Sequence, residues 1–173
     1  MTAFLKLFFA AFLFVSAQGA FAQELEFSPE LSLSCYYESD DGMNPHGCIG
    51  LSANACMEAT PGGYSTYGMG GCLNAELSFW DQELNAAYGE LMTYDKAVDA
   101  DGSDMGRAAM SRAENLRNMQ RAWIGFRDAS CDYERSQWGG GTGGGPAFVG
   151  CMMQMTGEQA MALQLALQYN QAQ

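Results

Sequence analysis

The strongest constraint in this sequence is an amphipathic run, Gln120–Cys131, that ends on a cysteine. At helical spacing, Trp123, Phe126 and Ser130 fall on one face of the run. Three polar residues lie near the border of that face: Gln120, Arg127 and Asp128. Because a disulfide at Cys131 would fix the helix end covalently, we interpret the run as a scaffold helix whose polar border residues are structural.

The N-terminal segment has the pattern of a secretory signal. Lys6 supplies a positive charge, residues 7–15 are apolar, and residues 20–22 read Ala-Phe-Ala, a typical cleavage site. The apolar stretch is shorter than the roughly 20 residues that a membrane-spanning helix needs. We therefore expect cleavage near Ala22 and a soluble, exported mature chain, periplasmic or extracellular, with no membrane insertion.

The charge of the chain limits its partners. The formal net charge is −12, and the loss of Lys6 makes the mature chain still more acidic. Such a charge disfavours nucleic acid and would steer the protein toward a basic partner. Solubility alone also explains an acidic surface. The sequence sets no oligomeric state.

Apolar residues recur at helical spacing in three long segments. The first stripe is Leu73, Leu77, Trp80, Leu84, Ala87, Leu91, Tyr94 and Val98. The second is Met105, Ala109, Leu116, Met119, Trp123, Phe126, Ser130 and Tyr133. The third is Phe148, Cys151, Met152, Met155, Gln159, Ala162 and Leu165. These stripes predict an all-α bundle in which the first two segments form a long antiparallel hairpin and a third helix is C-terminal.

The remaining segments divide the chain into three parts. Residues 1–22 are the expected signal peptide, residues 23–48 an irregular N-terminal arm, and residues 49–173 the helical domain. Within that domain we expect a short helix at 49–59, a loop at 61–71 that is rich in glycine and tyrosine, and a second, glycine-rich loop at 139–146.

No residue pattern marks a catalytic centre. His46 is the only histidine and lies among proline and glycine residues. Four carboxylates of the first long helix are interpreted as its solvent-facing side: Glu76, Asp81, Glu83 and Glu90. The acidic turn 99–104 lacks the spacing of an EF-hand. We therefore predict no enzymatic activity, no cofactor and no resident metal.

One cluster leaves a metal-handling alternative open. Met152, Met153 and Met155 place three thioethers close together, and methionine sulfur binds Cu(I) in exported proteins. Flexible methionine side chains more often fill gaps in a core. Copper binding is thus retained as a minor alternative function.

Several motifs together resemble a known family. They are Cys72–Glu76, Leu84–Tyr88, Gln120–Cys131, and Cys151 followed by Thr156. In this combination the chain resembles the lysozyme inhibitor LprI-like N-terminal domain family of small secreted bacterial helical domains, over residues 56–165. The signature residues, interpreted as structural, are Leu84, Asn85, Tyr88, Gln120, Trp123, Phe126, Arg127 and Asp128.

The resemblance implies a function as well as a fold. It implies a non-catalytic binding protein that inhibits a lysozyme, with a basic lysozyme as partner. The alternative is a structural or accessory envelope protein with another protein partner. Two departures stand out: no arginine follows Thr156 closely, and Cys35 and Cys48 lie outside the common core.

Six cysteines in an exported chain indicate three disulfides, for which fifteen pairings exist. Cys131 and Cys151 flank the glycine-rich loop and are the preferred pair. Cys56 with Cys72 follows from the same local argument and from the resemblance, which leaves Cys35 with Cys48.

Aromatic residues beside two loops are the candidates for a binding surface, and the alternative for Trp138 is that it caps the core of the bundle. Tyr64 and Tyr67 lie in the 61–71 loop, and Trp138 and Phe148 flank the glycine-rich loop. Aromatic side chains beside polar loops are frequent in protein-binding surfaces.

Overall fold

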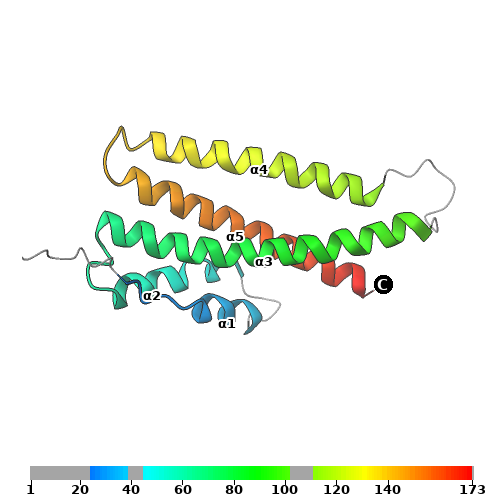
Figure 1. Ribbon diagram of the computed structural model, residues 1–173, viewed down its shortest axis with the longest axis horizontal. Coiled ribbons are helices and arrows are strands. Elements are labelled where there is room, and N and C mark those ends of the chain that lie inside the picture. The colour runs from blue at the N-terminus through cyan, green and yellow to red at the C-terminus, as the bar shows by residue number, and fades with distance from the viewer. Residues whose placement is uncertain (1–23, 39–44, 102–110, 173) are drawn as a thin grey trace, which may run out of the picture.

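The computed structural model describes residues 24–38, 45–101 and 111–172, which are helical and contain no strand (Figure 1). The elements are α1 (Glu30–Glu38), the 3₁₀ turn η1 (Pro45–Cys48), α2 (Leu51–Ala59), α3 (Thr66–Asp101), α4 (Arg112–Ser136) and α5 (Gly144–Gln171). The predicted all-α fold is confirmed. None of the helices in these ranges is both long and apolar enough to cross a membrane. The expected signal segment lies outside the described residues.

The long helices lie side by side, with α5 between α3 and α4 (Figure 1). α3 and α4 are antiparallel, as the predicted hairpin requires. Their direct contact is limited, because α5 packs extensively on α3 and then on α4. α1 and α2 cover the other side of α3 (Figure 1). The C-terminal helix is therefore the centre of the bundle.

α3 is 36 residues long and buries one stripe along most of its length. The stripe contains Trp80, Leu84, Ala87 and Leu91, as the apolar spacing predicted. Its first turns are centred one residue earlier than predicted, on Cys72 and Glu76. Leu73 and Leu77 are only half-buried at the edge of the core.

The predicted core face of α4 is right at Leu116, which is buried, and at Trp123, which packs against the core, but wrong toward the C-terminus. Phe126 is 65% exposed and Tyr133 is 69% exposed, whereas Gln120 and Cys131 are buried. The disulfide at Cys131 turns that side of the helix toward α5. Five residues earlier, Phe126 points about 140° away, because successive helical residues are about 100° apart. The buried stripe therefore runs through Leu116, Gln120 and Cys131.

α5 also buries a different face from the one predicted. Leu165 is 67% exposed, and Ala162 is exposed as well. Helix α5 contacts two long neighbours, so its apolar residues need not form one narrow stripe. The buried residues are Gly144, Met153, Thr156, Gly157, Ala160, Met161, Leu163 and Leu167.

Three segments expected to be irregular are partly helical. The arm at 23–48 contains α1 and η1: α1 packs against α2 and η1, and η1 also contacts α5. α3 begins at Thr66, inside the expected 61–71 loop, and α5 begins at Gly144, inside the expected 139–146 loop. In each case burial against a neighbouring helix stabilises a segment whose sequence has low helix propensity of its own.

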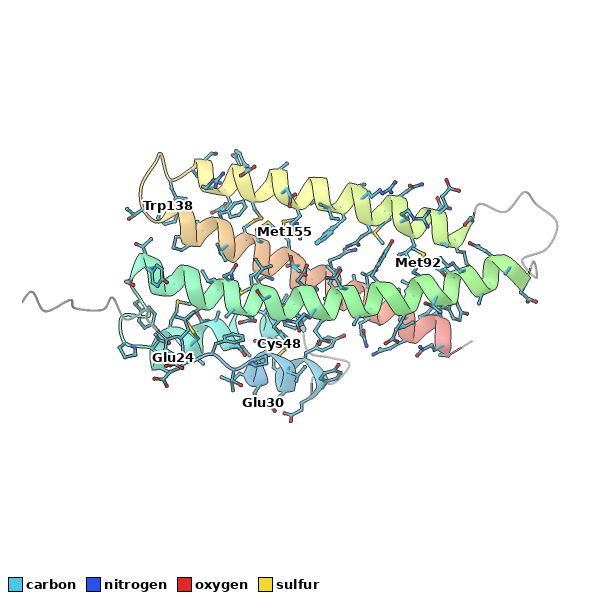
Figure 2. All side chains as sticks on the ribbon, in the orientation of Figure 1. Glu24, Glu30, Cys48, Met92, Trp138 and Met155 are labelled. Atoms are coloured by element: carbon cyan, nitrogen blue, oxygen red, sulfur yellow. A yellow bond between two sulfur atoms is a disulfide. The ribbon has the colours of Figure 1, made fainter. Side chains whose placement is uncertain are left out.

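Three disulfides connect neighbouring elements; their sulfur atoms are drawn in yellow in Figure 2. Cys35–Cys48 joins α1 to η1, Cys56–Cys72 joins α2 to α3, and Cys131–Cys151 joins α4 to α5. These are the three pairs that the sequence favoured.

A carboxylate near the C-terminus of α3 connects that helix to the start of α4. Asp99 accepts hydrogen bonds from the Ser111 hydroxyl at 2.6 Å and from the Arg112 N–H at 2.8 Å. Ser111 is the N-cap of α4, and its hydroxyl oxygen accepts from the Glu114 N–H. The Ser111 hydroxyl, followed by the Arg112 N–H, lowers the pKa of Asp99 below its ordinary value of 3.8. Asp99 thus joins α3 to the positive end of α4.

Substitution Asp99→Asn is expected to destabilise the protein at neutral pH and to have less effect in acid. A lowered folded-state pKa contributes stability that is present above the unfolded pKa and lost as pH falls through the folded value. Urea unfolding of both proteins between pH 7 and pH 2 measures this. The pKa of buried Asp95 is raised, first by desolvation and to a lesser extent by the Asp99 charge, so the substitution also lowers the pKa of Asp95 toward its ordinary value. A difference that does not change with pH would contradict the assignment.

Candidate protein-binding surface

A buried carboxylate holds the N-terminal helices against α3. Glu76 is 0% exposed. Its Oε1 accepts hydrogen bonds from the Ser32 hydroxyl, the Gly50 N–H and the Trp80 indole N–H at 2.7–2.9 Å. Its Oε2 accepts from the Ala53 N–H at 2.6 Å. Gly50 is the N-cap of α2 and has no side chain to cap it, so Glu76 does so from α3.

The assignment of Glu76 to a solvent-facing side of the helix is therefore wrong. Asp81 and Glu90, by contrast, are exposed. The spacing of charges within α3 does not reveal which carboxylate faces the N-terminus of another helix. A glycine at the start of α2 is the one feature of the sequence that indicates a missing cap.

Two serines complete the same junction. The Ser32 N–H donates to the Ser52 Oγ at 3.1 Å, and the Ser52 N–H donates to the Ser32 Oγ at 3.0 Å. Both residues are buried. The first turns of α1 and α2 thus cap each other, which fixes both helices on α3.

The turn between α2 and α3 presents two tyrosines from a closely packed backbone. Tyr64 is 63% exposed and Tyr67 is 71% exposed. The Ser65 Oγ accepts a hydrogen bond from the Gly68 N–H at 3.0 Å at the start of α3. A Cβ on Gly68 would lie 2.4 Å from the Gly62 carbonyl oxygen, so only glycine fits. The disulfide between α2 and α3 fixes both sides of this turn.

The turn between α4 and α5 presents Trp138, which is 51% exposed. Its ring lies over Gly143, where a Cβ would come within 2.3 Å of the indole Cζ3. Gly139 and Gly140 have positive φ values of 54° and 84°. Only glycine adopts such values readily, so the run of glycines forms a defined turn beneath the indole ring.

Phe148 is placed differently from the other three aromatic candidates. It is half-buried on α5, and the Arg135 guanidinium lies 4.8 Å from its ring centroid. The same arginine also lines an open pocket of about 430 Å³. The pocket is lined by Asp132, Arg135, Ser136, Gly140, Gly141, Gly144 and Gly145. Phe148 therefore supports the turn and presents little surface to a partner.

Both turns lie at the same end of the bundle. Figure 1 shows the start of α3 and the α4–α5 turn at one end, and Figure 2 labels Trp138 there. The first turns of α3 and α5 are in contact, since a Cβ on Gly150 would lie 3.8 Å from Leu73 Cδ1. We call the exposed Tyr64, Tyr67 and Trp138 the aromatic end.

Charge is distributed unevenly over the molecule. Residues 24–95 contain no lysine or arginine, so α1, α2 and nearly all of α3 are purely acidic. α4 carries five arginines against four carboxylates. Exposed carboxylates of the acidic part are Glu24, Glu26, Glu30, Glu38, Glu58, Asp81 and Glu90. A cationic partner is therefore attracted to the side of the molecule formed by α1–α3.

The signature polar residues of α4 lie at its contact with α5. The Arg127 side chain is 15% exposed and donates to Asp128 Oδ1 at 2.8 Å. Its guanidinium is 4.9 Å from the Trp123 ring centroid and 3.5 Å from Oγ1 of the buried Thr156. The Gln120 Oε1 accepts a hydrogen bond from the Gln159 Nε2 at 3.1 Å.

The remaining signature residues lie on α3. Leu84 is buried and Tyr88 is half-buried against the core. Asn85 is exposed and donates to Asp81 Oδ2 at 2.9 Å. None of these side chains belongs to the aromatic end.

Among the described residues, no three His, Cys, Asp or Glu side chains lie where they could hold a metal ion. His46 Nδ1 lies 3.5 Å from Glu158 Oε1 at the surface. Met153 is buried beside Gly50, whereas Met155 lies between α4 and α5 and contacts their disulfide at 3.9 and 4.0 Å (Figure 2). These two thioethers point in nearly opposite directions.

Comparison with known proteins assigns the chain to a family. The family profile of the lysozyme inhibitor LprI matches residues 56–163, more than half of the chain. The chain belongs to the LprI family. The match begins at Cys56. It includes the Cys56–Cys72 and Cys131–Cys151 disulfides and the aromatic end. The resemblance noted from the sequence is therefore confirmed.

Two relatives of this LprI-family chain carry no functional description. One is the uncharacterized protein R02472 of Rhizobium meliloti strain 1021, 29% identical over 53% of the chain and 66% of that protein. The other is the uncharacterized protein YecT of Escherichia coli K12, 29% identical over 54% of the chain and 59% of that protein. The chain thus spans less than two thirds of either relative. No solved structure matches.

Proposed function

We propose that this LprI-family chain is an exported, non-catalytic protein that inhibits a basic lysozyme by binding it through the aromatic end. The observation that carries the proposal is that three exposed aromatic side chains lie on two turns at the same end of the bundle. Aromatic side chains supply large contact areas at low entropic cost, and tyrosine and tryptophan are frequent among the residues that dominate binding.

The disulfides support this role. The turn bearing Tyr64 is fixed by Cys56–Cys72, and the turn bearing Trp138 by Cys131–Cys151. A pre-ordered surface loses little conformational entropy on binding. An inhibitor that blocks a cleft benefits from this rigidity, because less of the binding free energy is spent on ordering the loops that enter the cleft.

The acidic surface supports the choice of a basic partner. It would accelerate encounter with a cationic enzyme, and this attraction weakens as salt increases. The proposal of export is supported by the signal pattern at residues 1–22 and by three disulfides, which persist in oxidising compartments. Mass spectrometry of the secreted protein should give a chain that begins near Gln23.

Substitution Trp138→Ala is expected to weaken binding to a cationic lysozyme by about thirtyfold, the effect of losing one dominant aromatic contact. Clearing of a cell-wall suspension, followed by turbidity over a series of inhibitor concentrations, measures this. Wild-type protein should slow clearing. Adding Tyr64→Ala and Tyr67→Ala to the Trp138→Ala variant should weaken inhibition further.

The matched control is Tyr169→Ala. Tyr169 is 68% exposed near the C-terminus of α5, at the opposite end of the bundle. Its loss should leave inhibition unchanged. Inhibition that persists in the Tyr64, Tyr67 and Trp138 triple variant would remove the aromatic end from the proposal. No inhibition by the correctly disulfide-bonded wild type would favour an accessory envelope role with another protein partner.

The methionine alternative loses support from the geometry. Met153 and Met155, pointing to opposite sides of α5, cannot bind one ion together without unwinding the helix. A copper site made of all three methionines is therefore disfavoured.

A further inference from the structure

A second surface, on α4, is independent of the aromatic end. Large apolar side chains recur every seven residues on its solvent side: Met119, Phe126 and Tyr133 are 42%, 65% and 69% exposed. Small exposed residues alternate with them, namely Ala122, Ala129 and Ser136. The spacing of three and four residues is that of a helix-pairing seam. We call these six residues the α4 seam.

The α4 seam lies beside the face that α4 buries, and Met119 at its edge accepts a contact from Gln159 Nε2 of α5 at 3.5 Å through its sulfur. The buried stripe is centred on Gln120 and Cys131, about 120–140° around the helix from Phe126. The arginines Arg117 and Arg121 and the carboxylates Asp128 and Asp132 lie on a third side. The seam itself contains no charged residue over about five turns of a highly charged helix.

Gly125 gives an independent indication of close contact. It lies in the middle of α4, where glycine destabilises a helix relative to alanine. A Cβ at this position would meet no atom within 4 Å. Nothing in the described part of the molecule requires the glycine, whereas a helix packed from outside would be able to approach closely there.

From these observations we propose that the α4 seam pairs with the same seam of a second copy, giving a twofold-symmetric dimer. The distribution of charge favours a second copy at this surface. Two copies that met through α1–α3 would bring purely acidic surfaces together, whereas α4 is nearly neutral and its seam is uncharged. A cationic partner would instead be drawn to the acidic side.

The residue sizes indicate an antiparallel pairing. In that arrangement Met119, Phe126 and Tyr133 of one copy face the small residues of the other, so large and small side chains alternate across the contact. A parallel pairing would place Phe126 against Phe126 and alanine against alanine. The antiparallel dimer is isologous and leaves the two aromatic ends at opposite ends of the assembly, both accessible.

Sedimentation equilibrium of the mature, disulfide-bonded protein tests the dimer. We expect a monomer–dimer equilibrium that strengthens with added salt, because salt screens the repulsion between two acidic copies. Substitution Ala129→Glu, which places a charge in the seam, should raise the dissociation constant at least tenfold while the circular dichroism spectrum stays unchanged. Its matched control is Ala86→Glu, the same change at an exposed position of α3.

Three results would overturn the dimer: wild type that stays monomeric at millimolar concentration, an Ala129→Glu variant that dimerises normally, or an Ala86→Glu variant that is equally impaired. Lysozyme inhibition serves as a separate readout. The monomeric Ala129→Glu variant should still inhibit, so a failure of the dimer and a failure of the proposed function can be told apart.

Discussion

Substitution Glu76→Ala is expected to lower the free energy of unfolding by about 3–5 kcal/mol, a large part of the stability of a small domain. The change leaves four donors without an acceptor: the Ser32 hydroxyl, the N–H groups of Gly50 and Ala53, and the Trp80 indole. All four groups lie in the buried junction of α1, α2 and α3. Chemical denaturation at neutral pH, followed by circular dichroism, measures the loss.

The matched control is Glu90→Ala on the same helix. Glu90 is exposed, so its removal should change stability by less than about 0.5 kcal/mol. Glu76→Gln should also be destabilising, since one carboxylate oxygen is replaced by an amide that donates toward N–H groups. Equal stability of the Glu76 and Glu90 variants would show that the junction does not depend on the carboxylate.

Removal of the Cys131–Cys151 disulfide by paired alanine substitution is expected to cost about 3 kcal/mol, the entropy of closing a loop of this length. The two cysteines are 20 residues apart. The effect should be concentrated in α4, because α4 contacts the rest of the bundle mainly through α5. Hydrogen exchange should therefore accelerate most in the last turns of α4 and in the turn that carries Trp138.

The control is the paired alanine variant of Cys35 and Cys48, which are 13 residues apart. Its loop is of comparable length, so its global cost should be similar, but exchange in α4 should not change. Protection of α4 that is unaltered in the Cys131 and Cys151 variant would mean that packing alone holds the helix.

The sequence predicted those features that depend on local pattern. The stripe through Trp80, Leu84 and Leu91 placed α3 correctly because four-residue and three-residue spacing is a property of a single helix. The disulfides were predictable because each pair is close in sequence and flanks a turn. The candidate tyrosines and Trp138 were found by the same local reasoning, and they are exposed.

The features that depend on a neighbouring element were missed. Glu76 resembles any charged residue of a surface helix until the N-terminus of α2 is placed against it. Phe126 resembles a core residue until the disulfide at Cys131 sets the rotation of α4. In both cases hydrophobicity was the wrong guide, because the identity of the facing helix decided which side was buried.

The position of the binding surface is the central claim, and NMR titration of the isotope-labelled mature protein with a cationic lysozyme tests it most directly. We predict that shift changes and signal broadening will concentrate at residues 61–68 and 137–145, and that they will diminish with added salt. Changes confined to the exposed side of α3, to the α4 seam or to the C-terminal turns of α5 would contradict the account.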